Sequence, residues 1–162
     1  MPELKLKSIL QKCGVVGAGG AGFPSYAKLT EGADLLVINC IECEPLMYTD
    51  YELVREKLPE IVQGAQLIME HTNIKRAVLA IKAYRAMTLG LTDSQELAPG
   101  ICVKTVPNIY PMGDEINLIY QVTGRLIKPG NLPITQGVIV YNAETVYNTR
   151  NAVHENMPVI TK

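Results

Sequence analysis

Glycine dominates one short stretch of the chain, Gly14-Val-Val-Gly-Ala-Gly-Gly-Ala-Gly-Phe-Pro24. Backbone N–H groups in such a loop can approach an anion closely, and a helix beginning at Pro24 would add the favourable field of its N-terminus. Lys28 falls one turn into that helix and can reach the same anion. The stretch therefore predicts a phosphate-binding loop, with a tight turn that binds nothing as the alternative.

The surroundings of this loop differ from those of a dinucleotide-binding loop. Gly17, Gly19 and Gly22 fit the spacing G-x-G-x-x-G. That fingerprint also needs a strand before the loop and an acidic residue about 20 residues on, at the end of the next strand. Here the apolar spacing over 4–10 is helical, and the strand after the loop ends in Asn39. The sequence thus argues against an ordinary Rossmann fold.

Two carboxylates, Glu42 and Glu44, lie two residues apart in the segment Asn39-Cys-Ile-Glu-Cys-Glu-Pro45. In an extended loop both side chains project to the same side. They could then accept paired hydrogen bonds from a hydroxyl-rich group such as ribose or ribityl. A solvated acidic loop fits the spacing equally well.

Two further segments place polar residues at helix starts. Pro111-Met-Gly-Asp-Glu115 puts a glycine and two acids at one start, where acids also cap a helix and complement its dipole. Tyr141-Asn-Ala-Glu-Thr145 puts Asn142 at a strand-to-helix junction, where it can cap the helix or bind a ligand. Spacing alone leaves both assignments open.

Cysteine and histidine do not predict a metal site. Cys40 and Cys43 have ligand-like spacing, but a zinc or dithiol site normally needs a second pair or a nearby histidine. We expect two buried thiols in a reducing compartment, with the zinc or dithiol role as the alternative. His71 and His154 are expected to be packing or surface residues.

Strand and helix patterns alternate along the chain, which predicts a layered α/β/α domain on a largely parallel sheet. The expected strands are 34–38, 76–81, 101–106, 137–141 and the start of another at 159–160. The expected helices are 4–10, 25–31, 49–71 with a break at Pro59, 83–97, 114–123 and 143–155. The polar segments follow the glycine loop or strand ends, where such sheets bind ligands, which favours one shared site.

The amino-acid composition limits the classes of protein to which this chain can belong. The 162 residues, 48% of them hydrophobic, suit one domain with a substantial core. The 15 basic and 16 acidic residues nearly balance, so nucleic-acid binding is not expected. No apolar run approaches the roughly 20 residues of a membrane helix, and the N-terminus lacks a signal-peptide core. A cytoplasmic protein is therefore expected.

Together, the four segments resemble the FMN- and NADH-binding domain of the complex I flavoprotein subunit. They are more similar still to the C subunit of the Rnf electron-transport complex and its soluble relatives, such as the microcompartment cobalamin reductase. The resemblance rests on Gly17-Ala-Gly-Gly-Ala-Gly-Phe-Pro24, Asn39-Cys-Ile-Glu-Cys-Glu-Pro45, Tyr110-Pro-Met-Gly-Asp-Glu115 with Thr123-Gly-Arg125, and Asn142-Ala-Glu-Thr145. It implies a single FMN-binding domain over 1–162, forming the N-terminal part of a longer electron-transfer protein.

The resemblance also implies roles for individual positions. The FMN contacts would be Gly17, Gly19, Gly20, Lys28, Asn39, Glu42, Gly113, Asp114, Glu115, Asn142 and Thr145. The NADH contacts would be Phe23, Glu44 and Lys128. NADH would reduce the flavin, which would pass electrons to an iron–sulfur partner, and no side chain would act as acid or base.

The chain departs from the complex I pattern at several positions. Ala18 replaces an arginine and Ile41 an aspartate, and the region after Lys128 lacks the adenine-clamping aromatic residues. The resemblance therefore supports the flavin-binding residues more strongly than the NADH-binding residues. Iron–sulfur clusters are expected only in a partner or in further domains, and peripheral association with a membrane complex is compatible with this interpretation. The alternative is a non-catalytic interaction module that keeps the fold without the cofactor.

Overall fold

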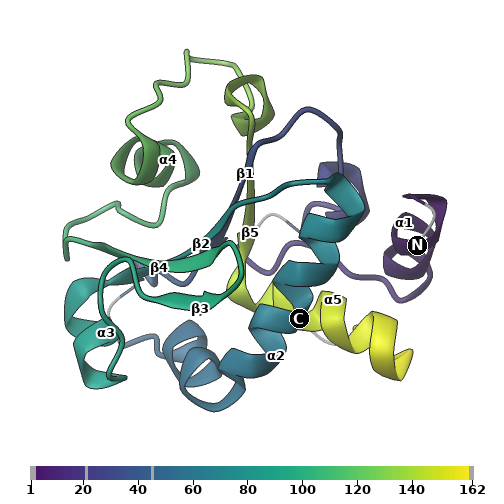
Figure 1. The fold of residues 1–162 in the computed structure, drawn as a ribbon, viewed down its shortest axis with the longest axis horizontal. Helices are drawn as coiled ribbons and strands as arrows, with labels where there is room; N and C mark the ends of the chain where they lie inside the picture. The colour runs from purple at the N-terminus through teal and green to yellow at the C-terminus, as the bar shows by residue number, and fades with distance from the viewer. Residues whose placement is uncertain (1–2, 21, 45, 161–162) are drawn as a thin grey trace.

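The computed structural model describes residues 3–20, 22–44 and 46–160. Figure 1 shows a central sheet with helices packed against it. The elements are, in order, α1 (Glu3–Lys12), the 3-10 helix η1 (Ser25–Lys28), β1 (Leu35–Asn39), α2 (Thr49–Thr72), β2 (Ala77–Lys82), α3 (Ala83–Thr88), β3 (Glu96–Ala98), β4 (Ile101–Val106), α4 (Glu115–Thr123), the 3-10 helix η2 (Pro133–Gln136), β5 (Val138–Asn142) and α5 (Ala143–Glu155).

The five strands form one sheet in the order β3-β4-β2-β1-β5. β1 pairs in parallel with β2 on one side and with β5 on the other, β2 pairs in parallel with β4, and β3 joins β4 as an antiparallel edge. The chain thus extends the sheet from β1 through β2 and then returns to the other side of β1 with β5. The strand order reverses between β1 and β5, and open α/β sheets bind ligands at the carboxyl end of such a crevice.

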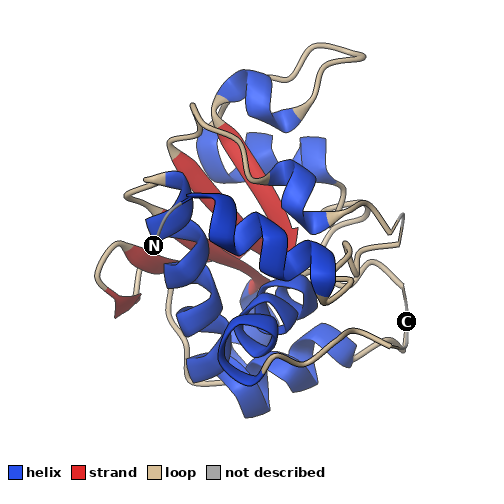
Figure 2. Ribbon diagram, turned by 90° about the vertical axis from the view of Figure 1, so that its right-hand side faces the viewer, coloured by secondary structure: helices blue, strands red, loops and turns tan. Residues whose placement is uncertain are grey.

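Residues along each strand alternate between two buried clusters. Leu36 and Ile38 of β1 join the core formed with α1, α2 and α5, whereas Leu35 and Val37 join the core formed with α4. In Figure 2, the helices of the first face lie in front of the strands. Such alternation between two apolar faces is the pattern of a sheet covered on both sides. The predicted layered α/β fold with a largely parallel sheet is confirmed.

Helix α2 bends near its first third and packs closely on α5 near its centre. The bend lies at Lys57, whose φ of −130° is not helical, two residues before Pro59. Pro59 has no N–H to donate to the carbonyl four residues earlier, which explains the break expected there. Gly64 then faces α5 so closely that a Cβ atom would lie 2.2 Å from the carbonyl oxygen of Val146.

The helix predicted over 25–31 is wrong in type and length, since only the short 3-10 helix η1 forms. The N–H of Leu29 donates to the carbonyl of Tyr26, three residues back. The carbonyl of Ser25 instead accepts a hydrogen bond from the hydroxyl of Tyr141 on β5. A tertiary hydrogen bond therefore takes the acceptor that an α-helix would use.

The helix predicted over 83–97 is also wrong beyond Thr88. Gly90, with a φ of +70°, lies in the left-handed region that ends helices. Asp93 then accepts hydrogen bonds from the N–H and hydroxyl of Thr105, which holds the turn against β4 and leads into the edge strand β3. The strand expected at 159–160 does not form either, although the N–H of Val159 donates to the carbonyl of Cys13.

Candidate functional site

A cavity of about 130 Å³ opens at the carboxyl ends of β1 and β5, where the strand order reverses. It is called the inner cavity here. Its lining residues are Gly17, Gly19, Gly22, Phe23, Lys28, Asn39, Gly113, Glu115, Val140, Tyr141, Asn142 and Thr145. Each of the four segments identified in the sequence therefore contributes residues to this one cavity, in agreement with the predicted shared location at the strand ends.

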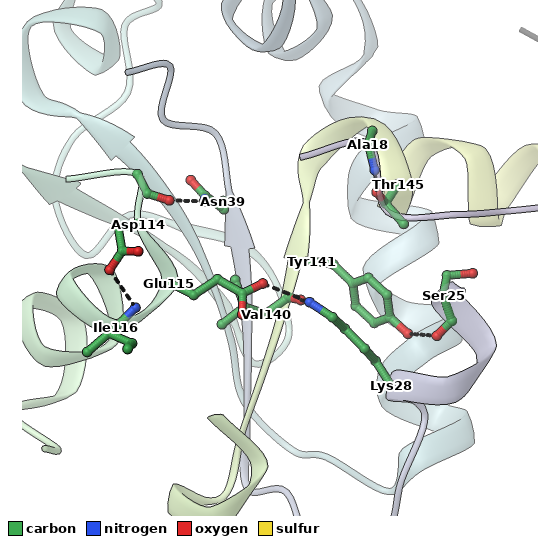
Figure 3. Close-up of polar contacts among 11 residues, drawn as sticks. Ala18, Ser25, Lys28, Asn39, Asp114, Glu115, Ile116, Val140, Tyr141 and Thr145 are labelled. Carbon is green, nitrogen blue, oxygen red and sulfur yellow. Dashed lines mark hydrogen bonds and ion pairs between the residues drawn. The ribbon is translucent and has the colours of Figure 1, made fainter. Parts of the chain in front are cut away.

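The glycine loop is held at both ends and projects over this cavity. Val15 accepts hydrogen bonds from the N–H and the hydroxyl of Ser25, and the N–H of Gly17 donates to the carbonyl of Phe23 at 2.7 Å. The N–H of Ala18 donates to the Thr145 hydroxyl at the start of α5, at 2.9 Å (Figure 3). Because α1 rather than a strand precedes the loop, its arrangement differs from the ordinary dinucleotide-binding fingerprint, as predicted.

Two glycines give the loop the features of an anion site. The N–H groups of Gly19 and Gly20 donate to no other residue in the described part of the chain. Gly20 has a φ of +121°, a conformation that side chains rarely adopt. Around Gly19 an added Cβ atom would meet only the Cβ of Asn142, at 3.9 Å. A ligand can thus approach the backbone closely, and the loop fits a phosphate group.

Lys28 supplies positive charge to the inner cavity. Its ammonium group donates to Glu115 at 2.7 Å and to the carbonyl of Val140 at 3.1 Å, which joins η1 to α4 and β5 (Figure 3). It also lies 6.0 Å from the ring centre of Phe23, which is about half exposed at the cavity edge. The cation is therefore placed beside the cavity and held there by its own partners.

Asn39 joins the end of β1 to the segment before α4. Its amide nitrogen donates to the carbonyl of Gly113 at 3.0 Å, and its amide oxygen accepts from the N–H of Ile41. Gly113 itself has no room for a side chain, because a Cβ atom would lie 2.7 Å from Cys43 Sγ and 2.8 Å from the Ile41 carbonyl. Asn39 and Gly113 thus position two walls of the cavity.

Asn142 is held in a similar way by a buried carboxylate. Its amide oxygen caps α5 by accepting from the N–H of Glu144, and its amide nitrogen donates to Asp50 at 2.9 Å. The pKa of Asp50 is raised to about 6, chiefly by burial and also by the charges of Glu42 and Glu144, while the hydrogen bond from Asn142 opposes the rise. The N–H of Asp50 in turn donates to Glu42. These contacts link the start of α2 to the inner cavity.

A second and larger cavity, of about 340 Å³, is lined in part by residues of the segment 39–44. It is called the outer cavity here. Its lining residues are Cys40, Glu42, Cys43, Glu44, Leu46, Met47, Tyr48, Lys82, Tyr84, Arg85, Asn108, Ile109 and Tyr110. The structure therefore places Glu42 and Glu44 beside the outer cavity and not in the inner one.

Three other predicted contacts line neither cavity. Gly20 stands in the glycine loop beside lining residues, and Asp114 caps α4 by accepting from the N–H groups of Ile116 and Asn117. Lys128 is exposed in the connection between α4 and η2. Whether any of the fourteen predicted residues touches a ligand stays a prediction. Ala21 and Pro45, which belong to the matched segments, lie outside the described residues.

The sequence reasoning missed Asp50 and Tyr141. In the sequence, Asp50 is indistinguishable from the acidic residues that commonly occupy the first turn of a helix. Its contact with Asn142 arises only from the tertiary structure. Tyr141 gave a usable signal, because a tyrosine within a buried strand needs a partner for its hydroxyl. That partner is the carbonyl of Ser25 below the glycine loop (Figure 3).

The cysteines are free thiols in the structure. Burial raises the pKa of the Cys40 thiol well above its usual value, which keeps it protonated and unreactive. Cys43 is half-buried and accepts a hydrogen bond from the N–H of Gly113. Across the described ranges, no three His, Cys, Asp or Glu side chains gather as metal ligands would.

The chain matches the protein-family model of the Nuo51 FMN-binding domain over residues 10–151. That range holds all four segments and both cavities. The chain belongs to this family. It is 38% identical to the cobalamin reductase PduS of Salmonella typhimurium (strain LT2), over 96% of the chain and 34% of that protein.

A second relative of this Nuo51-type domain is the C subunit of the proton-translocating ferredoxin:NAD(+) oxidoreductase complex of Clostridium ljungdahlii. The two are 32% identical, over 99% of this chain and 36% of the relative. The chain thus spans about a third of the length of these curated relatives. Among solved structures, an NAD+-reducing [NiFe]-hydrogenase in the H2-reduced state has the same fold, with a TM-score of 0.77 at 21% identity over 93% of this chain and 30% of that one.

Within the described ranges, every helix is too short or too polar to cross a bilayer.

Proposed function

We propose that this Nuo51-type domain binds FMN and works as an NADH-oxidising electron-transfer module that passes electrons through the flavin to an iron–sulfur partner. One observation carries the proposal. The N–H groups of Gly19 and Gly20 donate to no described residue, and they lie near Lys28 at the crevice between β1 and β5. Backbone donors and a cation at a topological switch point suit the phosphate of a mononucleotide.

The size of the inner cavity decides which part of FMN it would hold. Small-molecule sites usually span roughly 300–1,000 Å³, whereas the inner cavity has about 130 Å³. It suits the phosphate and part of the ribityl chain. The flavin ring would then extend along Gly113 and Glu115, toward the segment that carries Glu42 and Glu44.

The protein's own residues would bind and orient the cofactor. Lys28 would share its charge between Glu115 and the phosphate, and Thr145 would keep the loop in place through Ala18. FMN, when bound, supplies both hydride acceptance and one-electron release. No side chain at the inner cavity needs to act as an acid or base in this scheme.

The reaction partners are inferred from the relatives. One is a cobalamin reductase and the other belongs to a ferredoxin:NAD(+) oxidoreductase complex, so both are redox proteins. We take NADH as the electron donor, with Phe23 at the cavity edge, Glu44 and Lys128 as dinucleotide contacts. The acceptor would be an iron–sulfur protein or domain, and the site of action the cytoplasm.

The proposal is tested by colour. Purified protein incubated with FMN and desalted should be yellow, with one flavin per chain, and NADH added without oxygen should bleach it. A protein that stays colourless with excess FMN would refute flavin binding and support a non-catalytic interaction module. A yellow protein that NADH does not bleach would refute the NADH assignment alone.

Replacement of Lys28 tests the phosphate assignment. Lys28→Ala removes the cation beside the loop, and we expect FMN affinity to fall about tenfold or more, because a charge-assisted hydrogen bond to the phosphate is lost. Riboflavin, which has no phosphate, should bind both proteins alike. Quenching of flavin fluorescence measures both affinities.

A matched control is Lys57→Ala on α2, a half-buried lysine that pairs with Glu60 and lines neither cavity. Its FMN affinity should stay within twofold of that of the wild type. Equal loss of FMN and riboflavin binding in Lys28→Ala would contradict a phosphate role.

A further inference from the structure

Gly113 lines the inner cavity between two anchored neighbours. Met112 is buried in the core beneath α4, and the Asp114 side chain caps that helix. These neighbours fix the course of the chain into and out of Gly113. Further support for the residue comes from the segment 39–43, which packs against it on the side away from α4.

Two residues of that segment hold the polar backbone atoms of Gly113. The amide nitrogen of Asn39 donates to the Gly113 carbonyl at 3.0 Å, and the Gly113 N–H donates to Cys43 Sγ at 3.2 Å. Within the described part of the chain, this N–H makes no other hydrogen bond. A thiol sulfur is a weak acceptor, so the contact is sensitive to small changes in its position. The direction of the Gly113 N–H thus depends on one sulfur atom.

The packing around Gly113 leaves little room for movement. A Cβ atom there would lie 2.7 Å from Cys43 Sγ and 2.8 Å from the Ile41 carbonyl oxygen, so backbone and sulfur are already in close contact. Ile41 is buried in the core beneath α4, and Glu42 accepts the N–H of Asp50. Cys43 is thus carried by a segment that is itself fixed, and its side chain can set the position of Gly113.

We propose that Cys43 is a positioning residue for the flavin ring, because its sulfur holds the Gly113 peptide where the ring can lie against it. This inference rests on the proposed function, in which the ring extends along Gly113 and Glu115. Cys43 lines the outer cavity and not the inner one, so it acts through Gly113. A side chain without the sulfur lets Gly113 draw away from the ring, which weakens the binding of any flavin, with or without a phosphate.

Amide hydrogen exchange in the protein without flavin tests the contact between the two residues. In Cys43→Ala the acceptor is lost, and we expect the Gly113 N–H to exchange about tenfold or more faster than in the wild type. In Cys43→Ser a hydroxyl takes the place of the thiol as acceptor, and exchange should stay within about threefold of the wild-type rate. Nuclear magnetic resonance of the Gly113 amide measures both rates.

Flavin titration tests the consequence for the ligand. FMN and riboflavin should both bind Cys43→Ala about fivefold or more weakly than the wild type, and by the same factor, because the ring is the part that they share. Lys28→Ala, by contrast, should weaken FMN alone. The absorption bands of the bound flavin should also move in Cys43→Ala, since the ring meets a displaced peptide.

Two further variants serve as controls. Cys43→Ser keeps an acceptor and should bring both flavin affinities back to within about threefold of the wild type. Cys102→Ala removes a half-buried thiol on β4 that lines neither cavity, and it should leave the affinities, the absorption bands and the Gly113 exchange rate unchanged. If Cys43→Ala fails to fold, Cys43→Val replaces it, because valine keeps the bulk and has no acceptor.

Three results would overturn the proposal. They are an unchanged Gly113 exchange rate in Cys43→Ala, unchanged affinity of that variant for both flavins, and a loss confined to FMN, which would place the effect at the phosphate. Where the wild type binds FMN, these results leave the proposed function standing. A wild type that binds neither flavin overturns the proposed function, and the positioning role of Cys43 falls with it.

Discussion

At the scale of single residues, the polar groups around the inner cavity already hold one another. Asn39 joins β1 to Gly113, Asn142 joins α5 to Asp50, and Thr145 joins α5 to the glycine loop. Each side chain therefore stabilises the walls of the cavity before any ligand arrives. Substituting one of them should move a wall as well as remove a ligand contact, so its effect on affinity would exceed that of one hydrogen bond.

Asp50 makes the stability of this region depend on pH. The residue is only 9% exposed, and the folded pKa of its carboxyl group is about 6, compared with 3.8 for a free aspartate. The folded protein thus keeps a proton that the unfolded chain has released between about pH 4 and pH 6. Stability from this group is complete below pH 4 and falls as the pH rises through 6, by about 2–3 kcal/mol.

Asp50→Asn removes that titration and keeps a side chain able to accept from Asn142. We expect the variant to gain about 2–3 kcal/mol relative to the wild type between pH 4.5 and pH 7, because the wild type alone must bury a charge. Urea unfolding of both proteins at several pH values measures the difference. A difference that does not vary with pH would show that Asp50 is not perturbed in the folded state.

At the scale of elements, helix packing places the site. α5 carries Asn142 and Thr145 at its start, and its contact with α2 sets where that start lies. The contact depends on Gly64, because only a hydrogen atom fits beneath the Val146 carbonyl. The same approach brings Asp50, on α2, within hydrogen-bond distance of Asn142. A small residue in the helix interface thus determines a polar contact at the cavity.

Gly64→Ala should force α2 and α5 apart. We expect a loss of about 2–3 kcal/mol of unfolding free energy, since the clash involves backbone that cannot rotate away, together with weaker FMN binding. Gln66→Ala, at an exposed position on the same helix, should be nearly neutral. Denaturant unfolding and flavin titration measure both effects. A stable Gly64→Ala protein with unchanged FMN affinity would show that the helices do not position the site.

At the scale of the whole molecule, the inner cavity joins segments far apart in the chain. The glycine loop, the end of β1, the segment before α4 and the β5–α5 junction meet at a single edge of the sheet. Parallel pairing requires this meeting, since the carboxyl ends of neighbouring parallel strands lie together. A ligand bound there should therefore stabilise all four segments at once.

Hydrogen exchange can follow this coupling. FMN should slow amide exchange in 14–24, 39–44, 113–115 and 142–145 together, because a ligand of the folded state lowers the population of locally open forms. Riboflavin should protect the glycine loop less, for want of a phosphate. Exchange at β3, on the far edge of the sheet, should not change. Protection confined to one segment would contradict a shared site.

Much of the fold was predictable from the sequence because strong local signals coincide with the tertiary structure. The apolar strand at 35–39 and the periodic helix over α2 follow from patterns that tertiary contacts only reinforce. Prediction failed at η1, where the hydroxyl of Tyr141 donates to the Ser25 carbonyl that an α-helix would have used. It also failed after Thr88, where the N–H of Thr105 donates to Asp93 and holds a turn in place of a longer helix. Local propensity cannot report such bonds.

By itself, the sequence determined that four polar segments would gather at the carboxyl edge of a parallel sheet, because strand order and loop position are encoded in apolar periodicity and glycine spacing. Only the tertiary structure decided how they divide. It paired Lys28 with Glu115 and the Val140 carbonyl, placed Glu42 and Glu44 at a second cavity, and buried Asp50 against Asn142. These outcomes depend on side-chain directions and helix packing, which spacing along the chain does not specify.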